Sequence, residues 1–219
     1  MKTKQQRYFL SKVIQPYQEY IHSIRAHKPP IYFDSEYSPL REKVENLALA
    51  IHSLFTQPEF QVHGGVDLRN DLNGKHSCIK RLLSLATKAK HGSVTNQYYL
   101  PVDLSTDLCV FIFADLERYA YGYSPTLRTQ DTEEHFSKDF ADALDILNSQ
   151  LQLRLRIEEF PMFPPEHPIQ GNKIKLHLQD PFNFLEDGAP AHISTYRVKG
   201  QTFIKEKMSY DYEFAIFGL

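Results

Sequence analysis

The chain has 219 residues, of which 42% are hydrophobic and 24% are charged. This composition is typical of a folded globular protein and excludes a disordered chain. The formal net charge of −2 excludes a global attraction to nucleic acid or to an anionic membrane, so any such binding needs a local basic patch.

The cysteine content and the hydropathy indicate a cytoplasmic protein. Cys78 and Cys109 are too few for the disulfide framework of a secreted domain. The N-terminus is basic but lacks the apolar core of a signal peptide. No apolar run approaches the ~20 residues that span a bilayer. We therefore expect no membrane partner, and the oligomeric state is left open.

Three helices are predicted in the first part of the chain. Residues 3–26 carry apolar side chains at helical spacing, and Pro16 predicts either a kink or a new helix with Pro16 in its first turn. Residues 38–57 begin with Ser-Pro, which suits an N-cap and a first helical position, and end with Gln-Pro. The third helix is expected over residues 77–90.

The segments between these helices are predicted to be non-helical. Residues 31–33 form a short apolar run that is compatible with a strand, and a second short strand is considered over residues 59–62. Residues 63–74 have the composition of turns.

The most apolar stretch of the chain follows and predicts a meander of strands. Residues 109–113 have no polar interruption, which is typical of a strand buried on both faces. The runs 98–102 and 119–123 predict two neighbouring strands. Short connections at 105–107 and 115–117 suit antiparallel hairpins.

A fourth helix and a strand are predicted next. After a loop at 124–131, Asp131 and Glu134 have the spacing of a capping box. The buried stripe of this helix is predicted to comprise Phe136, Phe140, Leu144 and Leu147. Residues 151–157 alternate apolar and polar side chains more regularly than any other segment, which predicts a strand. Residues 160–168 contain four prolines and are expected to form a loop packed on the surface.

The C-terminal part is expected to be rich in strands. These are predicted over residues 174–178, 193–198, 202–208 and 210–217, with a two-residue turn at 200–201.

The predicted elements are segregated along the chain. Helices dominate residues 1–92, approximately, and strands dominate residues 93–219. Such segregation favours an α+β fold with about four helices and a mostly antiparallel sheet. We expect residues 1–219 to form a single domain.

Asp34 and Glu36 follow the apolar run 31–33. Two carboxylates two residues apart at a strand end point the same way and can share a divalent metal ion. The segment IYFDSEYSPL resembles the first motif of DEDD-type 3′–5′ exonucleases. This resemblance implies a metal-dependent nuclease that holds Mg²⁺ or Mn²⁺ on Asp34 and Glu36. The simpler interpretation is a turn before a helix that begins at Ser38, where the family has a hairpin.

The same resemblance implies a second aspartate from the middle of the chain and a late histidine with a final aspartate. The candidates are Asp103, Asp107 or Asp115 for the former, and His135 with Asp139 or Asp142 for the latter.

Two other patterns in the sequence have some features of metal sites. The Gly-Ser at 92–93 followed by Asp107 resembles polymerase-β-type nucleotidyltransferases, but Cys109 replaces the second aspartate and a thiol is a poor Mg²⁺ ligand. His63 and the other histidines near it fit no zinc spacing and are expected to be solvated.

Charge is unevenly distributed between two of the predicted helices. Residues 69–90 carry six basic side chains against one aspartate, whereas residues 131–145 carry six acidic side chains against one lysine. The two helices either pair with each other or expose a basic and an acidic face. An exposed basic face would bind phosphates, with Tyr119, Tyr121 and Tyr123 also available to stack on bases. The predicted binding residues are Arg69, Lys75, Lys80, Arg81, Lys88, Lys90, Tyr98 and Tyr99.

The common catalytic motifs for dinucleotide or nucleotide binding, serine hydrolysis and zinc proteolysis are absent from the sequence. The sequence therefore favours an interaction or accessory protein that binds a protein or nucleic-acid partner through charged and tyrosine-rich surfaces, without a cofactor. The alternative is a metal-dependent nuclease or phosphoesterase that uses Asp34, Glu36, His135 and Asp142 with Mg²⁺ or Mn²⁺. The sequence does not decide whether the protein is an enzyme.

Overall fold

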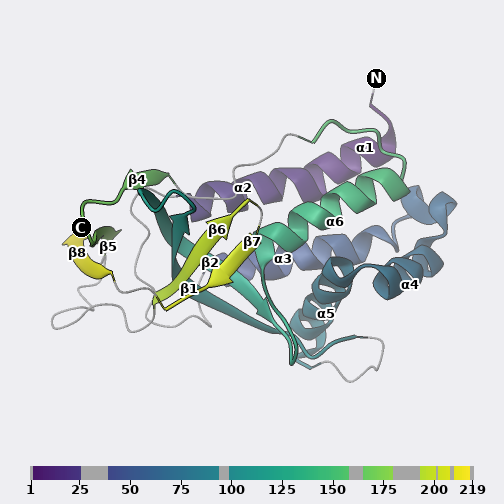
Figure 1. Ribbon diagram of the computed structural model, residues 1–219. Helices are drawn as coiled ribbons and strands as arrows, with labels where there is room; N and C mark the ends of the chain where they lie inside the picture. The colour runs from purple at the N-terminus through teal and green to yellow at the C-terminus, as the bar shows by residue number, and fades with distance from the viewer. Residues whose placement is uncertain are drawn as a thin grey trace. The chain divides into compact units, whose positions relative to one another are not determined.

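The computed structural model describes residues 2–25, 39–93, 99–157, 165–179, 193–200, 202–207 and 210–217 (Figure 1). The chain divides into two compact units, each assembled from three stretches. Unit 1 comprises Met1–Ile21, Pro39–Ser105 and Pro125–Phe160, and unit 2 comprises His22–Ser38, Thr106–Ser124 and Pro161–Leu219. The single domain over residues 1–219 stays a prediction.

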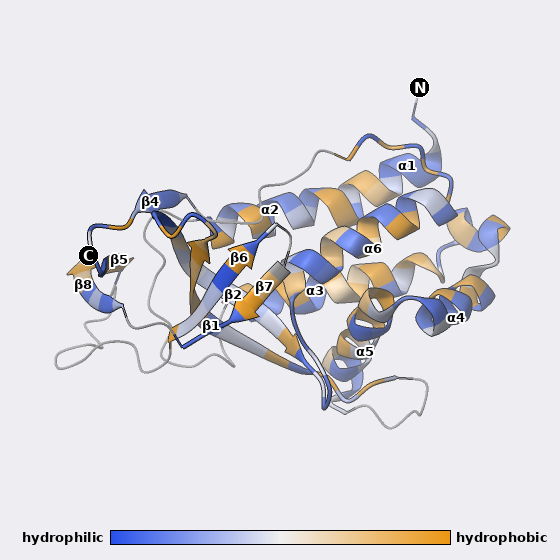
Figure 2. Ribbon diagram, viewed as in Figure 1, coloured by the Kyte–Doolittle hydropathy of each residue, from blue (hydrophilic) through white to orange (hydrophobic). Residues whose placement is uncertain are grey.

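Helices make up most of unit 1, and their polar and apolar residues alternate along α2 and α6 (Figure 2). This is the pattern of helices that bury one stripe. None of the helices in the described ranges is both long and apolar enough to cross a membrane. The helices are α1 (Lys4–Phe9), α2 (Gln15–Ile24), α3 (Pro39–Leu54), α4 (Gly65–Lys75), α5 (Ser77–His91) and α6 (Phe136–Gln150).

Pro16 lies in the first turn of α2, as predicted for a new helix. The residues before it form a π-helical segment, Leu10–Ile14, and the N–H of Gln15 donates to the carbonyl of Leu10. Proline has no N–H to donate and its ring crowds the preceding turn. The wider π turn between α1 and α2 makes room for the ring of Pro16 in the first turn of α2.

Aromatic side chains of α2 and α6 form the centre of the unit 1 core. The rings of Tyr17 and Phe140 stack with centroids 4.6 Å apart, and those of Tyr20 and Phe136 meet edge to face at 5.3 Å. The hydroxyl of Tyr17 donates to the carbonyl of Ser137 over 3.3 Å, and the hydroxyls of Tyr20 and Ser137 lie 2.9 Å apart. The predicted buried stripe of the fourth helix is confirmed.

Two predictions between α3 and α5 are wrong. Residues 59–62 belong to a 3₁₀ helix, Pro58–His63, and the predicted turn region is helix α4. Gly64, with φ of 99°, separates the two helical segments. The polar composition of α4 is why the sequence did not predict this helix. The helix buries Leu72 and carries a Lys75–Asp71 ion pair of 2.7 Å. Such i,i+4 pairs stabilise an exposed helix.

The predicted helix start at Asp131 and the loop at 124–131 are also wrong. Strand β2 (Arg118–Arg128) continues through Pro125, and a short strand β3 (Glu133–His135) pairs with it before α6 begins at Phe136. Thr126 lies opposite His135 and Arg128 opposite Glu133. Pairing with β2 therefore overrides the local capping pattern.

The segment 151–157, predicted as a strand, is not one. Leu151 and Leu153 are buried, so the alternation does report burial. However, Gln152 and Arg154 have φ of 50° and 52°, which is left-handed backbone. One partner of the segment is the Asn148 side chain, whose amide donates to the carbonyl of Leu155 over 2.8 Å and accepts from its N–H over 3.0 Å.

The larger sheet has the strand order β3-β2-β1-β6-β7, and β4 also pairs with β2. Strands β5 and β8 form a separate two-stranded sheet. The bounds are β1 Asp103–Phe113, β4 Glu166–Pro168, β5 Lys173–Gln179, β6 Ile193–Lys199, β7 Thr202–Lys205 and β8 Asp211–Phe217.

The α+β class is confirmed, and the sheet is mixed. The β1–β6 and β5–β8 pairs are parallel, which the sequence did not predict. Parallel pairing needs a long connection, and the β6–β7 hairpin lies within the connection from β5 to β8. The turn at 115–117 is confirmed by a 2.9 Å bond from the N–H of Leu116 to the carbonyl of Phe113. Residues 105–107, predicted as a connection, lie inside β1.

Candidate functional site

The predicted metal ligands Asp34 and Glu36 lie outside the described residues, as do residues 31–33. His135 is 6% exposed at the start of α6, whereas Asp142 is exposed and forms a 2.9 Å ion pair with Lys138. One member of this predicted pair is therefore buried and the other faces solvent. Within the described ranges, no three His, Cys, Asp or Glu residues form a group suited to a metal ion.

The basic and acidic helices pair at Arg81 and Asp139. The guanidinium donates from Nε and Nη2 to the two carboxylate oxygens, each over 2.6 Å. Arg81 is 7% exposed and Asp139 is 0% exposed. The hydrogen bond to Asp139 is the main cause that raises the pKa of Arg81. Arg81 therefore belongs to the core of unit 1 and not to the binding surface for which it was predicted.

Other predicted binding residues are also engaged within the fold. Lys88 donates to the carbonyl of Val102 over 3.0 Å and pairs with the carboxylate of Asp103. Tyr119, Tyr121 and Tyr123 are buried and cannot stack on a base. Tyr98 lies outside the described residues, whereas Tyr99 and Lys80 are partly exposed and Lys75 is exposed beside Asp71.

The remaining predicted basic residues, Arg69 and Lys90, gather near two histidines. Burial is the main cause that lowers the pKa of His52, and the positive charges of Arg69, Lys90 and His91 lower it further. Arg69 on α4 and Lys90 and His91 on α5 therefore lie within electrostatic range of His52 on α3. We call His52, Arg69, Lys90 and His91 the α3–α5 basic cluster.

Arg69 brings a hydrogen-bonding group to this cluster. Its Nε is buried and has no hydrogen-bond partner, while Nη2 makes a long 3.5 Å bond to Asn70.

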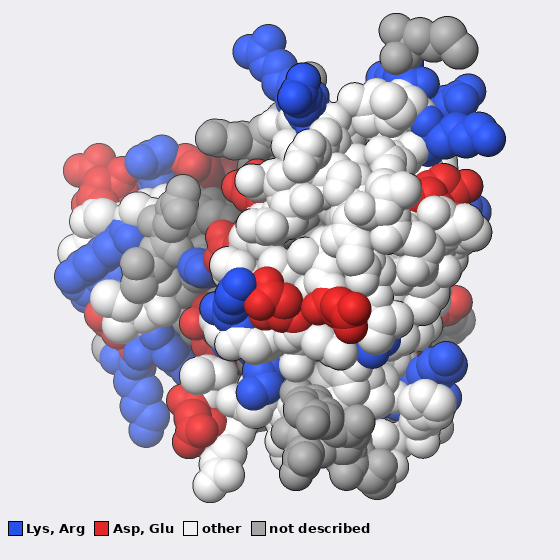
Figure 3. Space-filling model, turned by 90° about the vertical axis from the view of Figure 1, so that its right-hand side faces the viewer, with Lys and Arg blue, Asp and Glu red and all other residues white. Residues whose placement is uncertain are grey.

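Figure 3 displays one face of the molecule, on which basic and acidic side chains are interspersed around a broad area that has neither.

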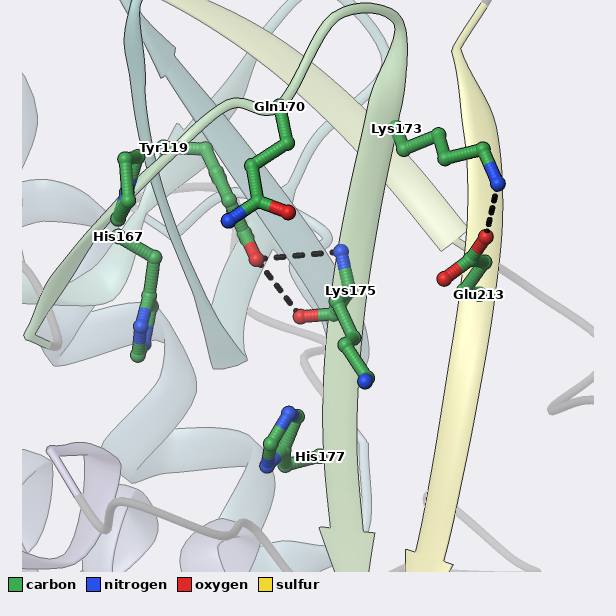
Figure 4. A pocket seen from close by; sticks show the side chains of 8 residues that line it. Tyr119, His167, Gln170, Lys173, Lys175, His177 and Glu213 are labelled. Carbon is green, nitrogen blue, oxygen red and sulfur yellow. Dashed lines mark hydrogen bonds and ion pairs between the residues drawn. The ribbon is translucent and has the colours of Figure 1, made fainter.

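A pocket of about 220 Å³ opens in unit 2 between strands β2, β4, β5 and β8 (Figure 4). Its polar lining residues are Tyr119, His167, Gln170, Lys173, Lys175, His177 and Glu213.

Two tyrosine hydroxyls hold the outer edge of β5 along this pocket. The hydroxyl of Tyr119 donates to the carbonyl of Lys175 over 2.7 Å and accepts from its N–H over 3.1 Å. Tyr121 makes the same two bonds to His177, at 3.3 and 2.9 Å. Burial is the main cause that raises the pKa of both tyrosines. The tyrosines thus act as partners of the backbone at Lys175 and His177, and both of these residues line the pocket.

The two histidines of the pocket are held by aromatic rings. His167 lies opposite Tyr119 in the β2–β4 pair, and its ring centroid is 5.4 Å from that of Tyr119 and 5.3 Å from that of Tyr121. The ring of His177 lies 5.7 Å from that of Phe217. In Figure 4, both imidazoles lie below the Tyr119 hydroxyl, that of His167 toward the left and that of His177 beside β5.

The pocket carries an excess of positive charge. Lys173 forms a 2.6 Å ion pair with Glu213. The hydrogen bond and charge of Lys173 lower the pKa of Glu213, and the charge of Lys175 lowers it further. Two ammonium groups therefore face one carboxylate, beside two imidazoles.

Sequence reasoning missed this pocket. The alternation that predicted β5 also places Lys173, Lys175 and His177 in a row on its polar face. This row of basic side chains could have indicated the pocket. His167 had no such signal, because it follows a proline-rich segment. Comparisons of the chain with protein-family models, curated proteins and solved structures find no match.

Proposed function

We propose that the protein binds nucleic acid through the α3–α5 basic cluster. The observation that carries the proposal is the convergence of His52, Arg69, Lys90 and His91 from three helices. Every charge that shifts the pKa of His52 is a cation, so a bound polyanion would relieve repulsion within the cluster.

Phosphate is the anion that suits this cluster. The buried Nε of Arg69 lacks a hydrogen-bond partner, and an unsatisfied buried donor costs about 1–3 kcal/mol. Arg69 is only partly buried, and the planar guanidinium can bind phosphate through two parallel hydrogen bonds. Lys90 and His91 are exposed in the last turn of α5, where a backbone phosphate can reach them.

The test is fluorescence anisotropy with short labelled single-stranded RNA and DNA at increasing salt. Each phosphate contact contributes a slope of about −0.7 to log affinity against log salt for single strands. The double variant Arg69→Gln/Lys90→Gln is expected to weaken binding and to reduce that slope by about 1.4.

The matched control is Lys75→Gln, because Lys75 lies on α4 outside the cluster and is paired with Asp71. It is expected to change the slope much less than the double variant. Binding that is insensitive to salt, or an equal loss in the control, would contradict the proposal. The metal-dependent nuclease with Asp34 and Glu36 stays a prediction, as does a protein partner.

A further inference from the structure

We propose that the pocket of unit 2 cleaves RNA phosphodiester bonds without a metal ion, with His167 and His177 as the proton-transferring groups. The lining residues, their ring contacts and their charges carry this proposal. It uses residues of unit 2 alone and goes beyond the binding proposed for the α3–α5 basic cluster.

The size and charge of the pocket suit one phosphate with its ribose. Pockets of about 300–1,000 Å³ take drug-sized ligands, and this one is smaller, at about 220 Å³. Lys175 supplies an ammonium beyond the one that Glu213 neutralises on Lys173. The Gln170 side chain adds an amide donor to the lining. A phosphodiester anion is therefore a better ligand than a cation or an uncharged molecule.

Two imidazoles in one pocket can supply both a general base and a general acid. Histidine changes charge near neutral pH, so one ring can be neutral while the other is protonated. Contacts with Tyr119 and Tyr121 restrict the ring of His167. A contact with Phe217 restricts the ring of His177. The double hydrogen bond from Tyr121 also fixes the backbone of His177. Restricting both groups before substrate arrives is what proton transfer in a site requires.

The proposed reaction is an internal transfer at phosphorus. The neutral imidazole takes the proton from the ribose 2′-hydroxyl, and the 2′ oxygen forms a bond to phosphorus. The bond from phosphorus to the 5′ oxygen breaks, and the protonated imidazole donates its proton to that oxygen. The products are a 2′,3′-cyclic phosphate and a 5′-hydroxyl, with no net change in protons or electrons. The ammonium of Lys175 stabilises the charge on the non-bridging oxygens.

The experiment is cleavage of the dinucleotide UpA by the full chain in the presence of EDTA, with the products separated by chromatography. We expect the 2′,3′-cyclic phosphate from UpA and no cleavage of the deoxy analogue, which lacks the 2′-hydroxyl. Inhibition by EDTA, or equal cleavage of the deoxy analogue, would overturn the inference and favour the nuclease with Asp34 and Glu36.

Variants locate the activity. His167→Asn and His177→Asn are each expected to lower the rate by about 10²-fold or more, the usual contribution of general acid–base catalysis. Lys175→Gln is also expected to lower it, and this exposed side chain can be changed without loss of the fold. The matched control is His22→Asn, because His22 is exposed on α2. Unchanged rates in all three pocket variants, each checked for a native melting midpoint, would contradict the assignment.

Binding is measured separately by titrating uridine 3′-monophosphate and following the histidine NMR signals. Binding that is lost in Lys175→Gln, without cleavage of UpA, identifies a phosphate site that is not catalytic and refutes the cleavage proposal. The anisotropy experiment on the α3–α5 basic cluster is independent of both results.

Discussion

The guanidinium of Arg81 and the carboxylate of Asp139 form two parallel hydrogen bonds of 2.6 Å, and both residues are buried. This pair joins α5, the predicted basic helix, to α6, the predicted acidic helix. It buries one member of each charge run, whereas Lys90 of the basic run and Asp145 of the acidic run are exposed. Arg81 has a structural role, and the binding surface has to be sought among the other basic residues.

Removing one partner of this buried pair is expected to destabilise the protein strongly. Asp139→Ala leaves a buried guanidinium without a counterion, which costs about 3–5 kcal/mol. Urea unfolding followed by circular dichroism measures the change in the free energy of unfolding. The control is Lys138→Ala, which breaks the exposed pair with Asp142 and is expected to cost at most about 1 kcal/mol. Similar losses in both variants would show that the Arg81–Asp139 pair is of little importance.

The tyrosine hydroxyls on β5 are expected to stabilise unit 2. Tyr119→Phe removes the partner of both backbone groups of Lys175, and an unsatisfied group costs about 1–3 kcal/mol. Hydrogen exchange measures this directly, because the amide of Lys175 should exchange faster in the variant. Tyr210→Phe serves as the control and should leave that amide protected. Unchanged exchange at Lys175 in Tyr119→Phe would mean that the hydroxyl is not its partner.

The Asn148 side chain is expected to fix the conformation of residues 151–157. Asn148→Leu has a similar volume but cannot form either bond to Leu155, and we expect a loss of about 1–3 kcal/mol. Asn148→Asp keeps an acceptor but loses the donor, so it should cost less. Urea unfolding measures the free energy of unfolding of both variants and so distinguishes Asn148→Leu from Asn148→Asp. Equal stability of all three proteins would contradict the role given to Asn148.

His52 is expected to make the protein less stable at acidic pH. Burial and the cations Arg69, Lys90 and His91 lower its folded-state pKa below the ordinary 6.5. As the pH falls through that value, the unfolded chain takes up a proton that the folded chain does not, so the free energy of unfolding decreases. His52→Gln should therefore lose less stability between about pH 7.5 and about pH 5.5 than the parent protein.

The same residue links pH to binding. A polyanion at the α3–α5 basic cluster favours the charged form of His52, so affinity should rise as the pH falls, and less so in His52→Gln. His22→Gln, at an exposed position, is the control and should behave like the parent in both measurements. A variant of His52 with the pH dependence of the parent would contradict the position assigned to His52 in the cluster.

The sequence by itself determined the elements that depend on near neighbours. The helices α3 and α5, the buried stripe of α6, the alternation of β5 and the turn at 115–117 were all predicted. In each case the pattern repeats within a few residues, and the burial of one face follows from it. The α+β class follows from the order of these elements.

Tertiary structure decided the elements and sites whose hydrogen-bond partners lie elsewhere in the chain. The segment 151–157 alternates like a strand but bonds to a side chain, Asn148. Asp131 and Glu134 have the spacing of a capping box, but residues 133–135 pair with β2. The backbone of Lys175 is satisfied by a hydroxyl 56 residues away.

The same reason applies to the candidate sites. Arg69 and Lys90 were predicted as binding residues from local charge, but His52 joins them only through the packing of α3 against α5. His167 and His177 share a pocket because β4 pairs with β2 and the tyrosines of β2 hold β5. A local pattern states which face of an element is polar. Only the packed fold decides which polar faces meet, because their partners are set by contacts between residues distant in sequence.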